Sequence, residues 1–180
     1  MKLLPLLSAI PDQRTRKGRR YDLPHILMFT VFAMLSGADS YRKITLFMEE
    51  RFSVLKKLCD INWKRPPAHT TLRDILGGLD QDSLELAFRQ HAASLVSLPV
   101  DAVIAIDGKT LRGSFDHALG RRALIMVSAF ATAEMISLGH IMLDDSEKIG
   151  EIPAVQQLIA QLNLSGKLYS LDALHCQKNG

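Results

Sequence analysis

Two aspartates follow short apolar segments of the kind that form buried strands. Asp107 comes directly after residues 104–106 (Ile-Ala-Ile), and Asp172 comes directly after residues 169–171 (Tyr-Ser-Leu). In open α/β sheets, sites form in the crevice where strand ends meet. If these strands are parallel neighbours, the two carboxylates lie at one edge, where a divalent cation relieves their repulsion. Mg²⁺ or Mn²⁺ prefers such oxygen ligands and assists phosphodiester hydrolysis.

Three further side chains lie close to these aspartates in the sequence. Lys109 and Arg112 are placed to hold a phosphate of a DNA backbone, or they are solvated charges on a turn. His175 faces the metal site if a helix begins after Asp172, and otherwise it is a capping or surface histidine. Each aspartate could likewise do no more than end its strand, because Asp is common in turns.

A second group of residues is a dense run of positive charge near the start of the chain. Such a run neutralises phosphates and releases counterions, which gives salt-dependent attraction to DNA that does not depend on base sequence. The alternative is a disordered basic arm without a fixed partner. The run comprises Arg14, Arg16, Lys17, Arg19 and Arg20.

Helical patterns dominate the first half of the chain. One helix is predicted after Asp22, with Pro24 in its first turn and an end at Gly37. Another is predicted after residues 39–40, a short one from Thr70 or Thr71, and a longer one after an Asp80 cap. Residues 97–99 (Ser-Leu-Pro) read as a linker, so a helical, basic region is predicted over residues 1–97.

The pattern of the second half predicts strands. Residues 103–106 form an apolar run of the kind that a sheet buries on both faces, and two more strands are predicted within residues 123–130 and 135–143. A helix with Pro153 in its first turn precedes a strand over residues 167–171. This β-β-β-α-β order allows the fourth strand to lie parallel to the first. The predicted fold class is therefore α+β, with this second part over residues 98–180.

Composition and charge narrow the class of protein. Hydrophobic residues make up 47% and charged residues 23%, as in ordinary globular domains. Residues 1–80 hold 14 Lys/Arg and 8 Asp/Glu, a net +6, whereas residues 81–180 hold 8 and 11, a net −3. Cys59 and Cys176 lack metal-ligand spacing and read as free thiols of a reducing cytoplasm. We therefore expect a protein of the bacterial cytoplasm that associates with the nucleoid. No apolar stretch predicts a membrane span.

Several segments together resemble a known family. Residues 106–113 (Ile-Asp-Gly-Lys-Thr-Leu-Arg-Gly) and 172–177 (Asp-Ala-Leu-His-Cys-Gln) resemble the two acidic motifs of H-repeat-associated DDE transposases, which are found with Rhs elements. Residues 147–153 resemble the stretch that separates these motifs, although Gly150 stands where the family often has Asn. Segments within residues 10–41 resemble the family's accessory helical region.

This resemblance implies a ribonuclease-H-like catalytic domain that moves an insertion sequence by cut-and-paste chemistry. It further implies Mg²⁺ or Mn²⁺ held by an Asp-Asp-Glu triad, with Asp107 and Asp172 as its first two members, and double-stranded insertion-sequence ends as the DNA partner. Homo-oligomers are expected. The residues after Asp172 include no carboxylate side chain, so the catalytic domain is expected to be incomplete here and this stretch inactive alone.

Two other functions fit the same residues. One is a non-catalytic remnant that binds DNA through the basic run or interacts with a full-length transposase. The other is a ribonuclease-H-like nuclease that cuts DNA without strand transfer.

Overall fold

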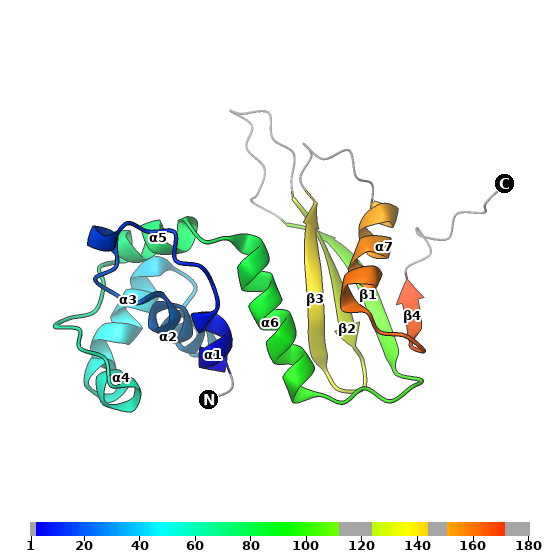
Figure 1. Cartoon of the computed structure of the whole chain (residues 1–180), viewed down its shortest axis with the longest axis horizontal. Coiled ribbons are helices and arrows are strands. Elements are labelled where there is room, and N and C mark those ends of the chain that lie inside the picture. Colours follow the sequence, from blue (N-terminus) through cyan, green and yellow to red (C-terminus); the bar gives the residue numbers. More distant parts are fainter. Residues whose placement is uncertain (1–2, 112–123, 144–150, 172–180) are drawn as a thin grey trace. The chain divides into compact units, whose positions relative to one another are not determined.

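The computed structural model describes residues 3–111, 124–143 and 151–171, without the side chain of Glu151. It forms two compact units, Met1–His91 and Ala92–Gly180 (Figure 1). Arg112, Glu147, Asp172 and His175 lie outside the described residues.

The first unit is helical. None of the described helices is long and apolar enough to cross a membrane. The longest, α6, begins in this unit, and its last residues belong to the second unit. The elements are α1 (Leu3–Ser8), a 3-10 turn η1 (Arg16–Gly18), α2 (Leu23–Leu35), α3 (Tyr41–Glu50), α4 (Phe52–Cys59), α5 (His69–Gly77) and α6 (Gln81–Leu95).

Local capping explains several of these boundaries. The Ser40 hydroxyl accepts a bond from the Lys43 backbone N–H at 3.4 Å, and an Asp80 carboxylate oxygen accepts one from Ser83 at 2.9 Å. Gly37 adopts a φ of 92° just after α2, a conformation that favours glycine. Asp22 stands at the N-cap of α2 as predicted, but its side chain makes no capping bond.

The core of the helical unit surrounds α2. Ile26, Met28 and Phe29 are almost fully buried on this helix, and they pack in one cluster with Leu7 of α1 and Leu72 of α5. A helix that is apolar nearly all round must be covered on most sides, and burial of each such side chain contributes about 1.5–3 kcal/mol. Helices α1 and α3 pack directly against α2, and buried side chains of α4, α5 and α6 complete the same cluster.

The second unit contains a four-stranded mixed sheet of order β3-β2-β1-β4. Its elements are β1 (Val103–Thr110), β2 (Ile125–Ala131), β3 (Ile136–Leu143), α7 (Glu151–Leu162) and β4 (Leu168–Leu171). β1 pairs antiparallel with β2, which pairs antiparallel with β3, whereas β4 runs parallel to β1. The predicted α+β class, the β-β-β-α-β order and the parallel arrangement are confirmed.

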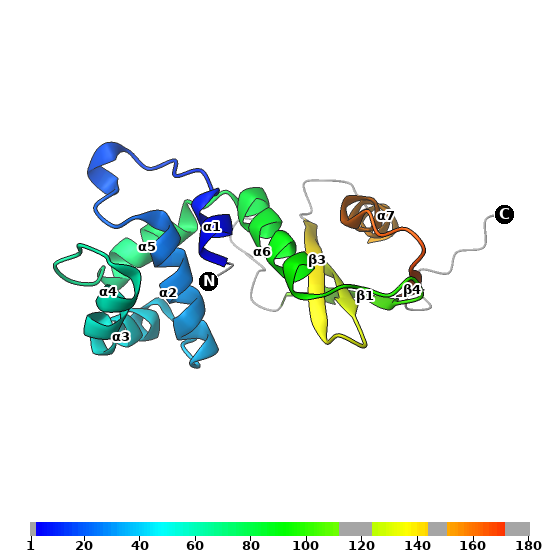
Figure 2. The same ribbon diagram turned by 60° about the horizontal axis from the view of Figure 1, so that its bottom comes forward.

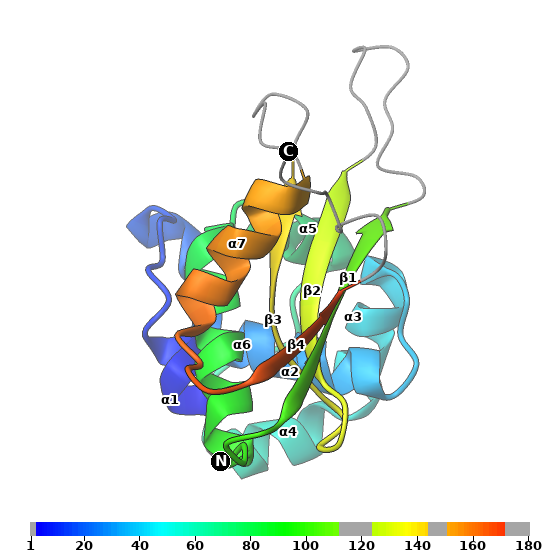
Figure 3. The same cartoon turned by 90° about the vertical axis from the view of Figure 1, so that its right-hand side faces the viewer.

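Helix α7 covers one face of this sheet, over β2 and β3 (Figures 2 and 3). Ile104 and Ile106 of β1 point to this face and pack in one cluster with Leu158 of α7. The prediction that residues 103–106 are buried on both faces is wrong. Val103 is 41% exposed whereas Ile104 is fully buried, because neighbouring residues of a strand point to opposite faces and α7 covers one of them.

Candidate functional site

Asp107 lies within a strand rather than at its end. β1 continues for three residues beyond it because Lys109 and Thr110 still pair with β2, opposite Met126 and Ile125. The prediction that Asp107 ends the strand is therefore wrong for the β2 side. On the other side, the parallel pairing with β4 stops at Ile106 opposite Leu171. Asp107 is thus the first residue of β1 beyond the described β4 pairing.

The register between β1 and β4 is held by contacts beyond the strand ladder. The backbone N–H of Leu168 donates to the Ala102 carbonyl at 3.0 Å, and the Lys167 ammonium donates to the carbonyls of Leu98 and Pro99 at 3.2 and 2.6 Å. The Tyr169 hydroxyl donates to the Leu164 carbonyl at 3.1 Å, and burial raises the pKa of this phenol. The Leu168 and Lys167 bonds to the segment before β1 hold β4 in register, whereas the Tyr169 bond ties β4 to the loop that follows α7.

Asp107 is exposed on the sheet face opposite to α7. It begins a polar row across three strands, since it pairs with Ser128 of β2, which in turn pairs with His140 of β3. The Ser128 hydroxyl donates to the Asp107 main-chain carbonyl at 3.4 Å, which leaves the Asp107 carboxylate out of that bond. Lys109 is also exposed and shares this face, two residues along β1.

Carboxylates suit a hard cation, and of the two predicted carboxylate ligands only Asp107 lies in the described part of the chain. Among residues 3–111, 124–143 and 151–171, no three His, Cys, Asp or Glu side chains are grouped closely enough to hold a metal ion. Asp107 is the described candidate ligand, while Asp172 and His175 lie outside those ranges. Arg112, the second predicted phosphate contact, also lies outside the described residues.

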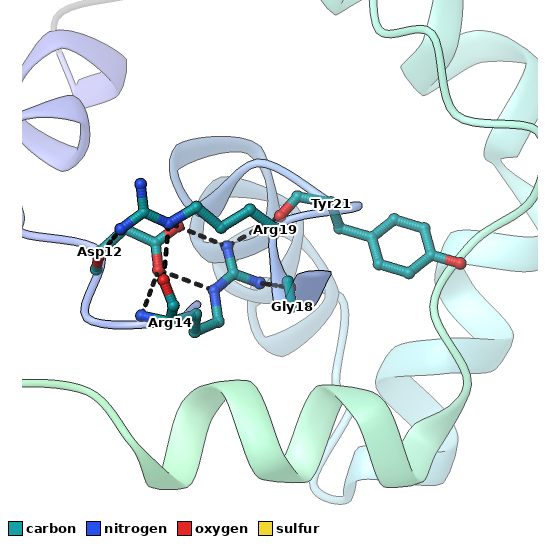
Figure 4. Close-up of polar contacts among 5 residues, drawn as sticks. All are labelled: Asp12, Arg14, Gly18, Arg19 and Tyr21. Carbon is teal, nitrogen blue, oxygen red and sulfur yellow. Dashed lines mark hydrogen bonds and ion pairs between the residues drawn. The ribbon is translucent and has the colours of Figure 1, made fainter. Parts of the chain in front are cut away.

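The basic run of the first unit forms an ordered loop built around Arg14 (Figure 4). The Arg14 guanidinium donates to both carboxylate oxygens of Asp12 at 2.8 Å, and it also donates to the carbonyls of Tyr21 at 2.8 Å and Gly18 at 3.2 Å. The hydrogen bond and charge of Arg14 lower the pKa of Asp12. The Arg14 side chain is 18% exposed, so its donors are largely used within the loop.

The other cations of the loop divide into two kinds. Arg19 is half-exposed and donates to the main-chain carbonyls of Arg14 at 2.8 Å and Asp12 at 2.5 Å, which ties the two ends of the loop together. Arg16, Lys17 and Arg20 are exposed, and they form no ion pair within the described part of the chain. The loop therefore presents three cations to solvent from a backbone held by two others.

A second basic segment, which was not predicted from the sequence, adjoins this loop. The Tyr21 and Trp63 rings meet edge to face with centroids 5.1 Å apart, and the Tyr21 hydroxyl donates to the Pro66 carbonyl at 3.3 Å. Lys64 and Arg65, which lie between those two contacts in the sequence, are exposed. The Lys-Arg pair before two prolines could have drawn attention to this segment, but no local sequence pattern indicates that it lies beside residues 12–21.

Several known proteins are similar to this chain along nearly its whole length. The family model described as DDE_Tnp_1-associated matches residues 4–92. "Putative transposase YncI" of Escherichia coli (strain K12) is 34% identical over 98% of this chain, and the match covers 70% of that relative. This chain belongs to the H repeat-associated transposase family. "H repeat-associated putative transposase YbfD" of the same strain is 32% identical, with 99% of this chain and 69% of that relative covered.

Other members of the H repeat-associated family are longer. "Putative transposase YncI" of Escherichia coli O157:H7 is 35% identical over 98% of this chain, but the match covers 45% of that protein. The chain thus spans about half the length of the first curated relatives it matches. No solved structure gives a significant match to this chain.

Proposed function

We propose that this chain takes part in DDE-type transposition, in which metal-assisted hydrolysis and strand transfer act on the phosphodiesters of insertion-sequence DNA. The observation that carries the proposal is the parallel register of β1 and β4. Its last pair, Ile106 and Leu171, immediately precedes Asp107 and Asp172 in the sequence. Asp172 lies outside the described residues, and we propose that the register continues by one residue, which would bring the two carboxylates side by side. Membership of the H repeat-associated family supports the same assignment.

The proposed fold of the second unit is ribonuclease-H-like. Its support is the strand order β3-β2-β1-β4, with three antiparallel strands, a crossover helix α7 and a parallel fourth strand. In such a sheet, Asp107 and Asp172 would hold Mg²⁺ or Mn²⁺, which supplies Lewis-acid activation of the attacking and leaving oxygens. Lys109, exposed on the Asp107 face, would position a DNA phosphate, and Arg112 is proposed for the same role.

Calorimetric titration with Mg²⁺ and Mn²⁺ tests the metal site. We expect binding by the wild-type chain that both Asp107→Ala and Asp172→Ala abolish. Asp101→Ala is the matched control, because Asp101 is also exposed but precedes the opposite end of β1. Folded wild-type protein that binds neither ion would remove the metal site from the proposal. Loss of binding in Asp101→Ala as well would point to general charge attraction.

Products on DNA separate strand transfer from simple cleavage. A plasmid that carries insertion-sequence ends is incubated with Mn²⁺ and a target plasmid, and joined products are sought by sequencing across the junctions. Joined ends that depend on Asp107 support transposition. Cut but unjoined DNA supports the nuclease instead.

A non-catalytic DNA-binding role is the second candidate, and the ordered basic loop is the observation that favours it. Arg14 and Arg19 hold the loop backbone, while Arg16, Lys17 and Arg20 are exposed. Phosphate contacts of this kind need no metal and no catalytic carboxylate. DNA binding that is unchanged in Asp107→Ala and absent in the triple Gln variant of Arg16, Lys17 and Arg20 assigns binding to the helical unit alone.

A further inference from the structure

We propose that Lys64 and Arg65 extend the basic loop into one continuous surface for the phosphate backbone of double-stranded DNA. The inference rests on the proposed DNA-binding role of the helical unit and adds a second segment to it. The basic loop is residues 12–22, and the second segment is residues 62–68. These segments lie about forty residues apart in the sequence, and long-range contacts bring them together.

The two segments are joined through Tyr21 and Trp63. Both side chains are buried, with 6% and 7% exposure, and their rings pack edge to face with centroids 5.1 Å apart. The Tyr21 hydroxyl reaches the Pro66 carbonyl at 3.3 Å, and the Trp63 indole N–H donates to an Asp22 carboxylate oxygen at 3.0 Å. Each segment therefore supplies an aromatic anchor and a hydrogen-bond acceptor to the other.

The second segment is also fixed to the helical core. The Trp63 ring packs against Phe29 of α2 with centroids 5.6 Å apart, and the Lys56 ammonium donates to the Trp63 carbonyl at 3.3 Å. Pro67 is fully buried, and two adjacent prolines restrict the backbone that follows Arg65. Cations on a backbone that is already ordered lose less conformational entropy when they bind a ligand.

The charge of the joined surface favours a polyanion. Residues 12–22 carry five Lys/Arg and two Asp, a net +3, and residues 62–68 add two cations and no acid, which gives +5 in all. Arg20 lies next to the Tyr21–Trp63 contact, with its guanidinium carbon 5.7 Å from the Tyr21 ring centroid. Regularly spaced phosphates of a duplex are the ligand that fits cations on two adjoining segments.

Two other exposed cations of the helices are partly neutralised by neighbouring carboxylates. Lys43 pairs with Asp39 at 2.7 Å, and Arg73 pairs with Asp74 at 3.1 Å. Within the described part of the chain, Lys64 and Arg65 form no such ion pair. This difference supplies a charge-matched control.

The test is binding of a labelled DNA duplex, measured by fluorescence anisotropy over about 50–200 mM salt, a range over which phosphate contacts make affinity fall steeply. The variants are Lys64→Gln with Arg65→Gln, and the control Lys43→Gln with Arg73→Gln, which removes the same net charge. Emission from Trp63, the single tryptophan, checks that each variant is folded.

We expect the Lys64/Arg65 variant to make the negative slope of log association constant against log salt shallower by about 1.8 and to weaken binding roughly tenfold. Each phosphate contact contributes about −0.9 to that slope. The control pair should change neither quantity by as much. A wild-type slope in the Lys64/Arg65 variant, or an equal loss in the control, overturns this inference but leaves DNA binding by the basic loop intact. No DNA binding by the wild-type chain overturns the DNA-binding role itself, and stronger competition by duplex RNA than by duplex DNA overturns the choice of ligand.

Discussion

Replacing Arg14 by alanine is expected to destabilise the helical unit by about 1.5–3 kcal/mol, although Arg14 belongs to a run that reads as a DNA contact. Its guanidinium makes a two-bond pair with Asp12 at 2.8 Å and donates to the Tyr21 and Gly18 carbonyls. A hydrogen bond to a charged group contributes about 1.5–3 kcal/mol. We take the loss of roughly one such bond, because the loop relaxes and water reaches a side chain that is 18% exposed.

Urea unfolding followed by Trp63 fluorescence measures this loss, because the single tryptophan contacts Tyr21 at the end of the same loop. Arg14→Lys is the matched control: it keeps the charge but not the planar fork, so an intermediate loss is expected. Arg14→Ala within about 0.5 kcal/mol of the wild type, the usual range for surface substitutions, would refute the assignment of a structural role.

The same contact predicts a pH dependence. Arg14 lowers the pKa of Asp12 in the folded state, so the pair stabilises the fold above the unfolded pKa of about 3.9. That stabilisation is lost as the pH falls through the lower folded pKa. The difference between wild type and Arg14→Ala should therefore be full near neutral pH and shrink below about pH 4. A difference that stays constant down to acid unfolding would contradict the pairing.

Three further substitutions test other parts of the fold. Thr30 is 7% exposed and its hydroxyl has no hydrogen-bond partner in the described part of the chain. Thr30→Val should therefore raise the free energy of unfolding by about 0.5–1 kcal/mol, seen as a higher urea midpoint, and a lower midpoint would contradict this. Leu158→Ala removes a fully buried side chain of α7 and should cost about 2–5 kcal/mol, seen as faster amide exchange in the sheet; unchanged exchange would count against α7 as its cover. Burial raises the pKa of the Cys59 thiol. Alkylation of Cys59, measured at about pH 8 in a Cys176→Ser background, should therefore be slower than that of free cysteine, and an equal rate would show an exposed thiol.

Local sequence signals were sufficient for much of the secondary structure. Ser40 and Asp80 cap helices through bonds to backbone groups three residues away, and Gly37 follows α2 in a left-handed conformation. The strands of the second unit follow their apolar runs, and the crossover helix allowed β4 to be predicted parallel to β1. The caps and the apolar runs depend on residues within a few positions of one another, and the parallel pairing follows from the order of the elements, so the sequence carries both.

Tertiary contacts decided the rest. Asp22 looks like a capping residue, yet its carboxylate binds Trp63, forty-one residues away. β1 continues past Asp107 because β2 supplies a partner as far as Thr110. The sequence by itself indicated most of the helices and strands and where positive charge gathers, but it did not predict α1 or a separate α4. Only the folded chain decided that Arg14 serves its own loop and that Lys64 and Arg65 adjoin it, because long-range side-chain contacts leave no periodic or local trace in the sequence.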